Sequence, residues 1–173
     1  MRALLISGSP NARSATTALA HVAGGALGEL GATFRTLDLA EHPDPTTWHR
    51  TVAQAGAIVL ASPVHHAGYS GLLKTALDTL PGDAFADKAV GLLAHGSGPR
   101  TGNVVCEQLR TVAKALGGWV VPTQVAACPD DFTTADGPAA PLAPLLARCR
   151  AMAGELHRCA TMLGAAREAS CTT

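Results

Sequence analysis

Short apolar runs alternate along this chain with longer segments in which apolar residues recur at helical spacing. The runs at 57–61 and 89–94 are apolar throughout, which is typical of strands buried on both faces of a parallel sheet. Strands are predicted at 2–7, 33–37, 57–61 and 89–94, with a fifth beginning at 119–121. Helices are predicted at 15–30, 46–55, 70–80, 101–116 and 141–167. This order predicts an α/β fold with a doubly wound sheet, in a single domain over 1–173 whose tail from about residue 168 is disordered.

The composition argues against several classes of protein. The 13 basic and 13 acidic side chains of these 173 residues give a net charge of zero, so neither a nucleic-acid-binding protein nor an acidic electron carrier is expected. The 5 cysteines are odd in number and never stand at Cys-x-x-Cys spacing, so we expect reduced thiols and no metal site. Neither a signal peptide nor a membrane span is recognisable, so we expect a cytoplasmic protein without a membrane partner.

Three unusual connections follow predicted strands, at residues 8–14, 62–69 and 95–100. All three are rich in glycine, serine, proline or histidine. In doubly wound sheets, ligands bind beyond the carboxyl ends of the strands, near the point where the strand order reverses. We therefore expect these connections to meet at one edge and to form a ligand site there.

The first connection has the composition of a phosphate site. Gly8 is followed by hydroxyl and amide side chains, and a helix begins directly afterwards. Backbone N–H groups and the positive end of the helix dipole favour a bound phosphate at such a place. A P-loop is disfavoured because no lysine is nearby, and a dinucleotide fingerprint is disfavoured because Gly8 is the only glycine there. The alternative is an ordinary helix start in which Ser14 is the N-cap.

The second connection carries the most specific pattern. The stretch 61–78 resembles the second loop of the NADPH-dependent FMN reductases of the flavodoxin-like superfamily. Its matching residues are Pro63, Ser70, Gly71, Leu73, Lys74, Ala76 and Asp78. The first loop is similar to that family's phosphate loop through Gly8, Ser9 and Ser14, and residues 94–102 are similar to its glycine-rich turn. The resemblance covers residues 1–122 well and the rest loosely.

The resemblance implies a flavodoxin-like fold, with a five-stranded parallel sheet of order 2-1-3-4-5 and helices on both faces. It also implies non-covalent FMN, NADPH or NADH as co-substrate, a small-molecule electron acceptor or organic substrate, and a homodimer or homotetramer. The cofactor-binding residues that it implies, or that lie beside the loops, are Ser9, Asn11, Arg13, Ser14, Ala15 (through its amide), Thr16, Pro63, Val64, His65, His66, Gly68, His95, Gly96, Ser97, Gly98 and Arg100.

Three features depart from the family pattern. Asn11 stands where the family has an arginine, and Val64-His65-His66 replaces a Glu-Tyr-Asn triplet. The loop at 126–140, which carries Asp130, Asp131 and Asp136, has no assigned role. His65 and His66 either position the flavin or act catalytically as proton donor or acceptor for an organic substrate.

The predicted function is an FMN-dependent oxidoreductase that takes hydride from NAD(P)H. Its acceptor would be a flavin, a quinone, an azo or nitro compound, or a similar molecule. A dedicated pathway flavoenzyme that oxidises or reduces one organic substrate is the alternative, and the histidine pair favours it. A flavodoxin-type electron carrier ranks lower because the chain has no net charge.

Overall fold

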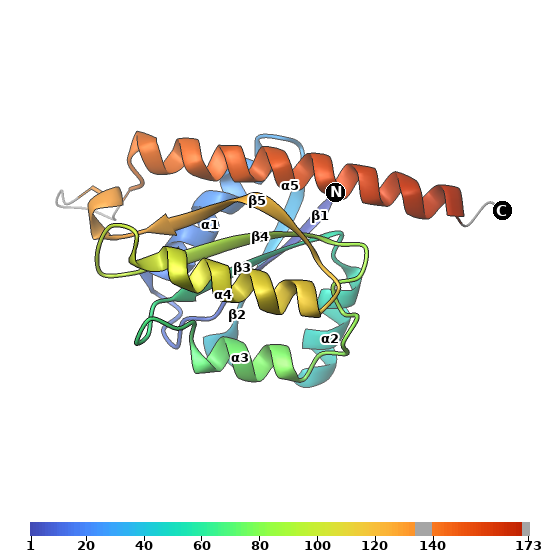
Figure 1. Ribbon diagram of the computed structural model, residues 1–173, viewed down its shortest axis with the longest axis horizontal. Coiled ribbons are helices and arrows are strands. Elements are labelled where there is room, and N and C mark those ends of the chain that lie inside the picture. Colours follow the sequence, from blue (N-terminus) through green and yellow to red (C-terminus); the bar gives the residue numbers. More distant parts are fainter. Residues whose placement is uncertain (134–139, 171–173) are drawn as a thin grey trace.

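The strands of the computed structural model form one parallel sheet in the order β2-β1-β3-β4-β5, which confirms the predicted topology (Figure 1). The structure describes residues 1–133 and 140–170. The strands are β1 (Arg2–Ser7), β2 (Thr33–Asp38), β3 (Ala57–Pro63), β4 (Ala89–His95) and β5 (Trp119–Ala127).

Helices cover both faces of the sheet. They are α1 (Ala15–Gly28), α2 (Pro45–Gln54), α3 (Gly71–Asp78), α4 (Thr101–Ala115) and α5 (Ala143–Ser170). Helices α1 and α5 pack on one face, and α2, α3 and α4 lie on the other (Figure 1). Two differences from the prediction are small. A 3-10 turn, η1 (Leu39–Glu41), lies within the expected loop 38–45, and α5 continues to Ser170, so residues 168–170 of the expected disordered tail are helical.

Strand alternation builds the two halves of the core. Along β1, Ala3 and Leu5 face α1 and α5, while Leu4 and Ile6 face the opposite helical layer. All four are at most 4% exposed, because successive side chains of a strand point to opposite faces and both faces are covered here. The continuous apolar runs of the sequence therefore reflect burial on two sides.

Three helices begin at a side-chain cap. Ser14 accepts a hydrogen bond from the Thr17 amide at the start of α1, and Asp44 accepts from the amides of Thr46 and Thr47 at the start of α2. Ser70 caps α3 in the same way. Such a cap stabilises a helix by about 1 kcal/mol because the first amides of a helix have no partner within it.

Strand β5 is longer than its predicted start indicated and enters the expected 126–140 loop by two residues, to Ala127. Its pairing with β4 shifts register between Val90 and Leu92. Pro122 lies in the shifted stretch and has no amide to donate. The amide of Thr123 donates instead to the Glu155 carboxylate of α5 at 2.8 Å, and Arg110 of α4 donates to the carbonyl of Val121 at 3.0 Å. Groups that the irregular strand leaves open are thus satisfied from helices on both faces.

The four cysteines of the described chain are free thiols. Burial raises the pKa of Cys106 to about 12 and that of Cys149 to about 11. Over the residues that the structure describes, no helix is long and apolar enough to cross a membrane.

Candidate cofactor site at the carboxyl edge of the sheet

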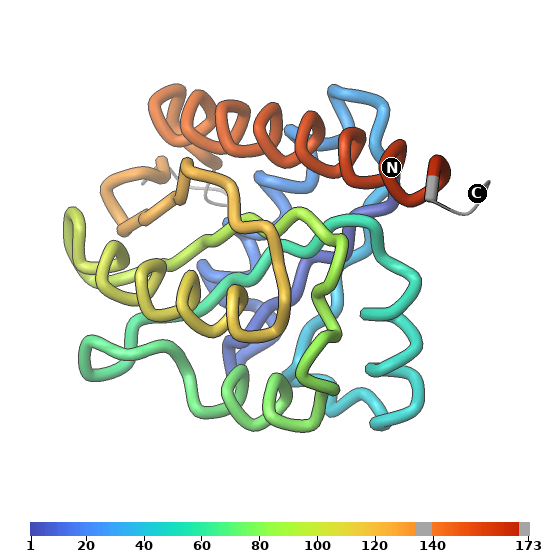
Figure 2. Tube along the Cα trace, turned by 45° about the vertical axis from the view of Figure 1, so that its right-hand side comes forward, coloured from blue at the N-terminus to red at the C-terminus, as the bar shows by residue number. Residues whose placement is uncertain are grey.

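The three unusual connections lie at the same end of the sheet (Figures 1 and 2). Pairing of Ser7 with Ala61 and of Pro63 with His95 makes their starting points neighbours. Two backbone hydrogen bonds continue this strand pairing into the loops. The Gly8 amide donates to the Ala61 carbonyl at 2.8 Å, and the Val64 amide donates to the His95 carbonyl at 2.9 Å. The predicted convergence of the loops is therefore present, and it follows from strand register.

The 8–14 connection folds back on itself before α1 begins. The Asn11 amide donates to Ser9 Oγ at 3.2 Å, and the Arg13 amide donates to Asn11 Oδ1 at 3.0 Å. Asn11 thus supports the loop where the family arginine is missing. Within the described residues, no acceptor is recorded for the amides of Ala15 and Thr16, the first two of α1. Those amides and the helix dipole make this end of α1 suited to an anion.

Thr17 anchors this loop to two strands, a role that the sequence did not reveal. Its hydroxyl lies 2.8 Å from Ser7 Oγ and 3.1 Å from Ser14 Oγ, and it donates to Asp38 Oδ2 at 3.1 Å. Thr17 is 8% exposed and Ser7 is fully buried. The hydroxyl thereby fixes Ser14 relative to the ends of β1 and β2, which holds the start of α1 in place.

Gly8 allows the first loop to pack directly against α3. A Cβ at this position would lie 2.6 Å from the Leu73 Cβ, closer than real contacts allow. The Ser70 hydroxyl donates to the Gly8 carbonyl, so the cap of α3 also bonds the phosphate-type loop. The first two loops therefore form one continuous surface.

The second connection contains a tight two-residue turn. His65 and Gly68 exchange two backbone hydrogen bonds, both at 2.9 Å, around His66 and Ala67. His66 has φ 50° and Ala67 has φ 60°, so two residues other than glycine occupy the left-handed region, the pattern of a type I′ turn. The imidazoles of His65 and His66 are exposed. Gln108 of α4 holds the turn, because its side-chain amide donates to the Ala67 carbonyl at 3.0 Å.

The third connection approaches the second at Gly96. This residue is buried, and a Cβ there would lie 2.0 Å from Thr101 Oγ1 and 3.1 Å from a Val64 methyl group. The Thr101 hydroxyl donates to the Gly98 carbonyl at 2.8 Å, which closes the loop onto the start of α4. Arg100 has φ 67° and an exposed side chain. The loop thus places its backbone and the exposed Arg100 side chain at the same carboxyl edge of the sheet as the other two loops.

His95 is the last residue of β4, and its ring lies beside the segment that follows β5. Its ring centroid is 6.1 Å from that of Phe132, and its Nε2 is buried without a hydrogen-bond partner in the described chain. Burial lowers the pKa of this imidazole, and the Asp131 carboxylate opposes part of the effect. His95 is therefore held toward its neutral form beside the site.

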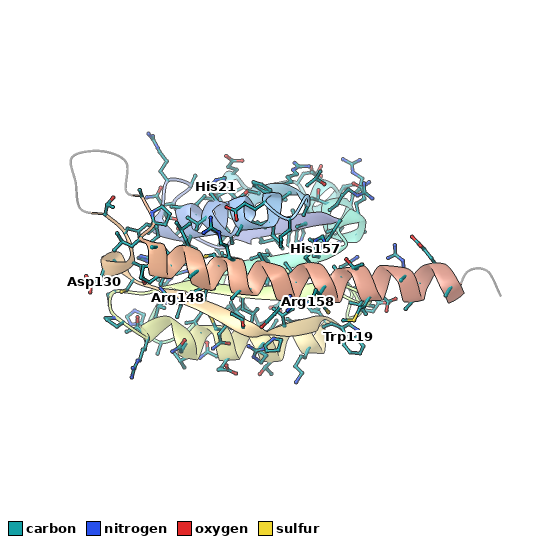
Figure 3. All side chains as sticks on the ribbon, turned by 90° about the horizontal axis from the view of Figure 1, so that it is seen from above. His21, Trp119, Asp130, Arg148, His157 and Arg158 are labelled. Atoms are coloured by element: carbon teal, nitrogen blue, oxygen red, sulfur yellow. The ribbon has the colours of Figure 1, made fainter. Side chains whose placement is uncertain are left out.

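The segment after β5 borders the same edge. A 3-10 turn, η2 (Pro129–Asp131), follows the strand, and Arg148 of α5 donates to the Ala126 carbonyl at 2.7 Å and to the Asp131 carboxylate. Asp130 and Arg148 lie at the same end of α5 (Figure 3). A cavity of about 310 Å³ opens here, with Arg100 and Arg148 among its lining residues. Asp136 lies outside the described residues.

The arrangement fits a flavin mononucleotide. The open amides at the start of α1 suit its phosphate, and the loops at 62–69 and 95–100 supply apolar contacts, backbone groups and Arg100 for a ring system. The predicted cofactor-binding residues all lie on this edge, in the three loops, at the end of β3 or β4, or in the first turn of α1. Which of them contact a bound flavin remains a prediction. The anchoring role of Thr17 and the contact made by Gln108 are additions from the structure, and the turn that Gln108 supports is formed 41 residues away in the chain.

Comparison with known proteins also indicates an enzyme that uses FMN. A family model of the NADPH-dependent FMN reductases matches residues 1–131. An FMN-dependent NADPH-azoreductase of Staphylococcus saprophyticus is 34% identical over an alignment of 154 residues that covers 79% of this chain and 81% of that protein. An oxidoreductase from Corynebacterium diphtheriae superimposes with a TM-score of 0.75 at 26% identity, over 94% of this chain and 98% of that chain. An apo NADH:FMN oxidoreductase superimposes with a TM-score of 0.69 at 25% identity, over 90% of this chain and 89% of that chain.

The sheet order and the loops at its carboxyl edge define a flavodoxin-like oxidoreductase. The chain belongs to the NADPH-dependent FMN reductase family. It is an NAD(P)H-dependent enzyme that uses FMN, as the sequence resemblance implied.

Proposed function

We propose that this enzyme takes hydride from NADPH or NADH and reduces an azo compound or a free flavin, with quinones and nitro compounds as further acceptors. The observation that carries this proposal is the placement of a phosphate-suited helix start beside two loops suited to a flavin ring, all at one edge. The azoreductase relative of Staphylococcus saprophyticus supports the azo class.

The residues at the start of α1 would hold the phosphate. The amides of Ala15 and Thr16 would donate to it, together with the hydroxyls of Ser9 and Ser14. Arg13, within this loop, would add a positive charge in place of the arginine that Asn11 replaces.

The other two loops would surround the ring. Pro63, Val64 and Gly68 would line one side of it, and the backbone of Gly96, Ser97 and Gly98 would lie near its pyrimidine edge together with Arg100. Bound FMN would supply hydride acceptance from the nicotinamide and electron donation to the acceptor. Donors and positive charge at the pyrimidine edge favour the reduced, more negative state of the ring.

The reaction is tested by anaerobic spectroscopy of the FMN-loaded protein. NADPH should bleach the flavin absorbance, and an azo dye added afterwards should restore it while the dye loses its own colour. A protein that cannot be loaded with FMN would overturn the proposal. A flavin that bleaches with NADPH but is not reoxidised by the dye would remove the azo class alone, and free FMN would then be tried as acceptor.

His65 and His66 support a second candidate, a flavoenzyme that acts on one organic substrate. Their exposed imidazoles stand on a turn that Gln108 holds, so one of them could donate or accept a proton at a substrate atom. We expect His66→Ala to retain FMN and to lose turnover of the organic substrate if the residue is catalytic. Unchanged turnover would leave His66 with a positioning role, and His65→Ala would test the other imidazole in the same way.

We also propose that the enzyme is a cytoplasmic homodimer or homotetramer. The free thiols of the described cysteines favour a reducing compartment. Trp119, which is 59% exposed on the edge strand β5, is the kind of residue that subunit contacts bury. Light scattering of the purified protein measures the assembly directly.

A further inference from the structure

A second cavity lies at the opposite edge of the sheet, where the strands begin. Its volume is about 460 Å³, larger than the cavity beside Arg100 and within the range of about 300–1,000 Å³ typical of small-molecule sites. The end of α2 and the segment before β4 form it, with Val52, Leu80, Pro81 and Ala84 among its apolar lining. Nothing in the proposed reaction uses this place.

Lys88 lines this cavity and is only 6% exposed. Its Nζ donates to the Ala55 carbonyl at 2.9 Å and to the Ala53 carbonyl at 3.2 Å, and Ala53 lines the cavity as well. An ammonium carries more donors than these carbonyls accept. Both carbonyls come from the end of α2, so Lys88 caps that helix.

This buried ammonium has no carboxylate partner in the described chain, where the ion pairs involve other residues. Charges this deeply buried are normally paired, because moving an unpaired charge out of water is strongly unfavourable. Burial lowers the pKa of Lys88, and Arg167 lowers it further, while Asp87 offsets a part. The partial negative charge at the end of α2 compensates only a fraction of a full charge.

The rim of the cavity adds positive charge. Arg50 of α2 supplies this charge, and Asp83 is the one acidic residue among the described residues that line the cavity. His49 Nε2 lies 3.3 Å from Thr79 Oγ1, and Arg50 is exposed. An apolar wall with a buried ammonium at one side and a guanidinium at the rim suits a ligand with an apolar body and one negative group.

We propose that this cavity binds a small organic anion, a carboxylate on an aromatic or other apolar body. The carboxylate supplies the counter-charge that Lys88 lacks and also contacts Arg50. The apolar body packs against Val52, Leu80 and Ala84. The site is separate from the flavin edge, because the two lie at opposite ends of the strands.

The test uses the FMN-loaded protein and two probes of nearly equal shape, naphthalene-2-carboxylate and naphthalene-2-carboxamide. Calorimetry at constant ionic strength should show the carboxylate binding about tenfold or more tightly than the amide, as expected for a charge-assisted contact at a buried cation. The flavin spectrum, recorded in the same titration, should stay unchanged, which separates this site from the flavin edge.

Variants locate the binding. Ala84→Leu fills the cavity without changing its charge and should abolish binding of the carboxylate, while Arg50→Gln should weaken it several-fold. Arg150→Gln is the matched control, because Arg150 is an exposed arginine of α5, paired with Glu29 on the other face of the sheet. Its binding should equal that of the wild type. Thermal melts establish that each variant is folded.

Lys88→Met separates the two roles of the lysine. If the variant folds, the preference for carboxylate over amide should disappear. If it does not fold, the wild-type preference for the carboxylate, its abolished binding in Ala84→Leu and its weaker binding in Arg50→Gln still decide the matter. Equal affinity for the two probes, or binding that Ala84→Leu leaves intact, would overturn the proposal. Failure of both probes to bind would leave Lys88 as a helix cap only and would also overturn it.

Discussion

Ala67 occupies a backbone conformation that side chains with a Cβ rarely adopt. Its φ of 60° lies in the left-handed region, in the turn that presents His65 and His66. We expect Ala67→Gly to raise the free energy of unfolding by about 0.5–1 kcal/mol, because glycine adopts this φ without steric cost. Urea unfolding measures the change. The control Ala160→Gly, within α5, should lower stability by about 1 kcal/mol, and a loss at both positions would contradict the assigned turn.

Gln108 is the residue outside the turn that restrains it. We expect Gln108→Leu to weaken FMN binding about fivefold, because one hydrogen bond to the Ala67 carbonyl is lost and the loop that borders the ring becomes looser. Flavin fluorescence measures the dissociation constant. Gln108→Lys keeps an N–H donor at this position and should restore part of the affinity. A leucine variant that binds FMN as the wild type does would show that the turn holds without this bond.

His95 makes stability depend on pH. Burial places the pKa of the folded imidazole below its ordinary 6.5, so the unfolded chain takes up the proton more readily. The stabilisation is fully present above about pH 6.5 and is lost as the pH falls through the window between the unfolded and folded pKa values. His95→Phe removes the titrating group and keeps a ring beside Phe132, so urea unfolding at several pH values should give a flatter profile.

At this scale the sequence predicted the helix cap at Ser14 but not the anchoring role of Thr17. Ser14 caps the helix that follows it directly, so local pattern was enough to predict its role. Thr17 depends on Asp38, which lies 21 residues away and becomes a neighbour through strand pairing. Contacts of that kind depend on the assembled fold and leave no local signature.

Helix α1 connects the fold to the cofactor, because its first turn serves both. We expect Ser14→Ala to lower the free energy of unfolding by about 1 kcal/mol and also to weaken FMN binding. Asp44→Ala is the matched control, since it removes the cap of α2, away from the flavin edge. It should cost similar stability and leave FMN binding unchanged. Equal effects of both variants on FMN would place the role of Ser14 in stability alone.

The elements themselves were largely predictable, and β5 shows where local pattern fails. Burial on two faces gave β3 and β4 their continuous apolar runs, and glycine and proline marked most helix ends. β5 instead contains Pro122 and an edge with polar side chains, and its later part depends on Glu155 and Arg110 from helices on opposite faces. Its full length therefore required tertiary contacts.

For the whole molecule, Trp119 is the most direct test of assembly. We expect the wild type to have the mass of a dimer or tetramer by light scattering, and Trp119→Lys to shift it toward a single chain, because the substitution places a charge on an exposed apolar surface. Leu30→Lys removes an exposed apolar residue elsewhere, 44% exposed, and serves as the control. A wild type that is monomeric at working concentrations would contradict the proposed assembly.

The overall fold was predicted correctly because the sequence pattern and the family resemblance indicated the same architecture. Alternating patterns predicted a doubly wound sheet, and the family resemblance supplied its strand order, which the structure confirms. The loops of the flavin edge were predictable because they follow strand ends. The cavity around Lys88 was not, because its walls come from α2 and the segment before β4, which show no shared motif.

Cys106 and Cys149 are buried in the core, and burial keeps both side chains in the thiol form. An enzyme that handles reducing equivalents in air meets hydrogen peroxide, which attacks thiolates far faster than thiols. With pKa values of about 12 and about 11, Cys106 and Cys149 are thiolates in about one molecule in ten thousand or fewer at neutral pH. These two thiols should therefore react slowly with peroxide while the protein is folded, and faster once unfolding exposes them.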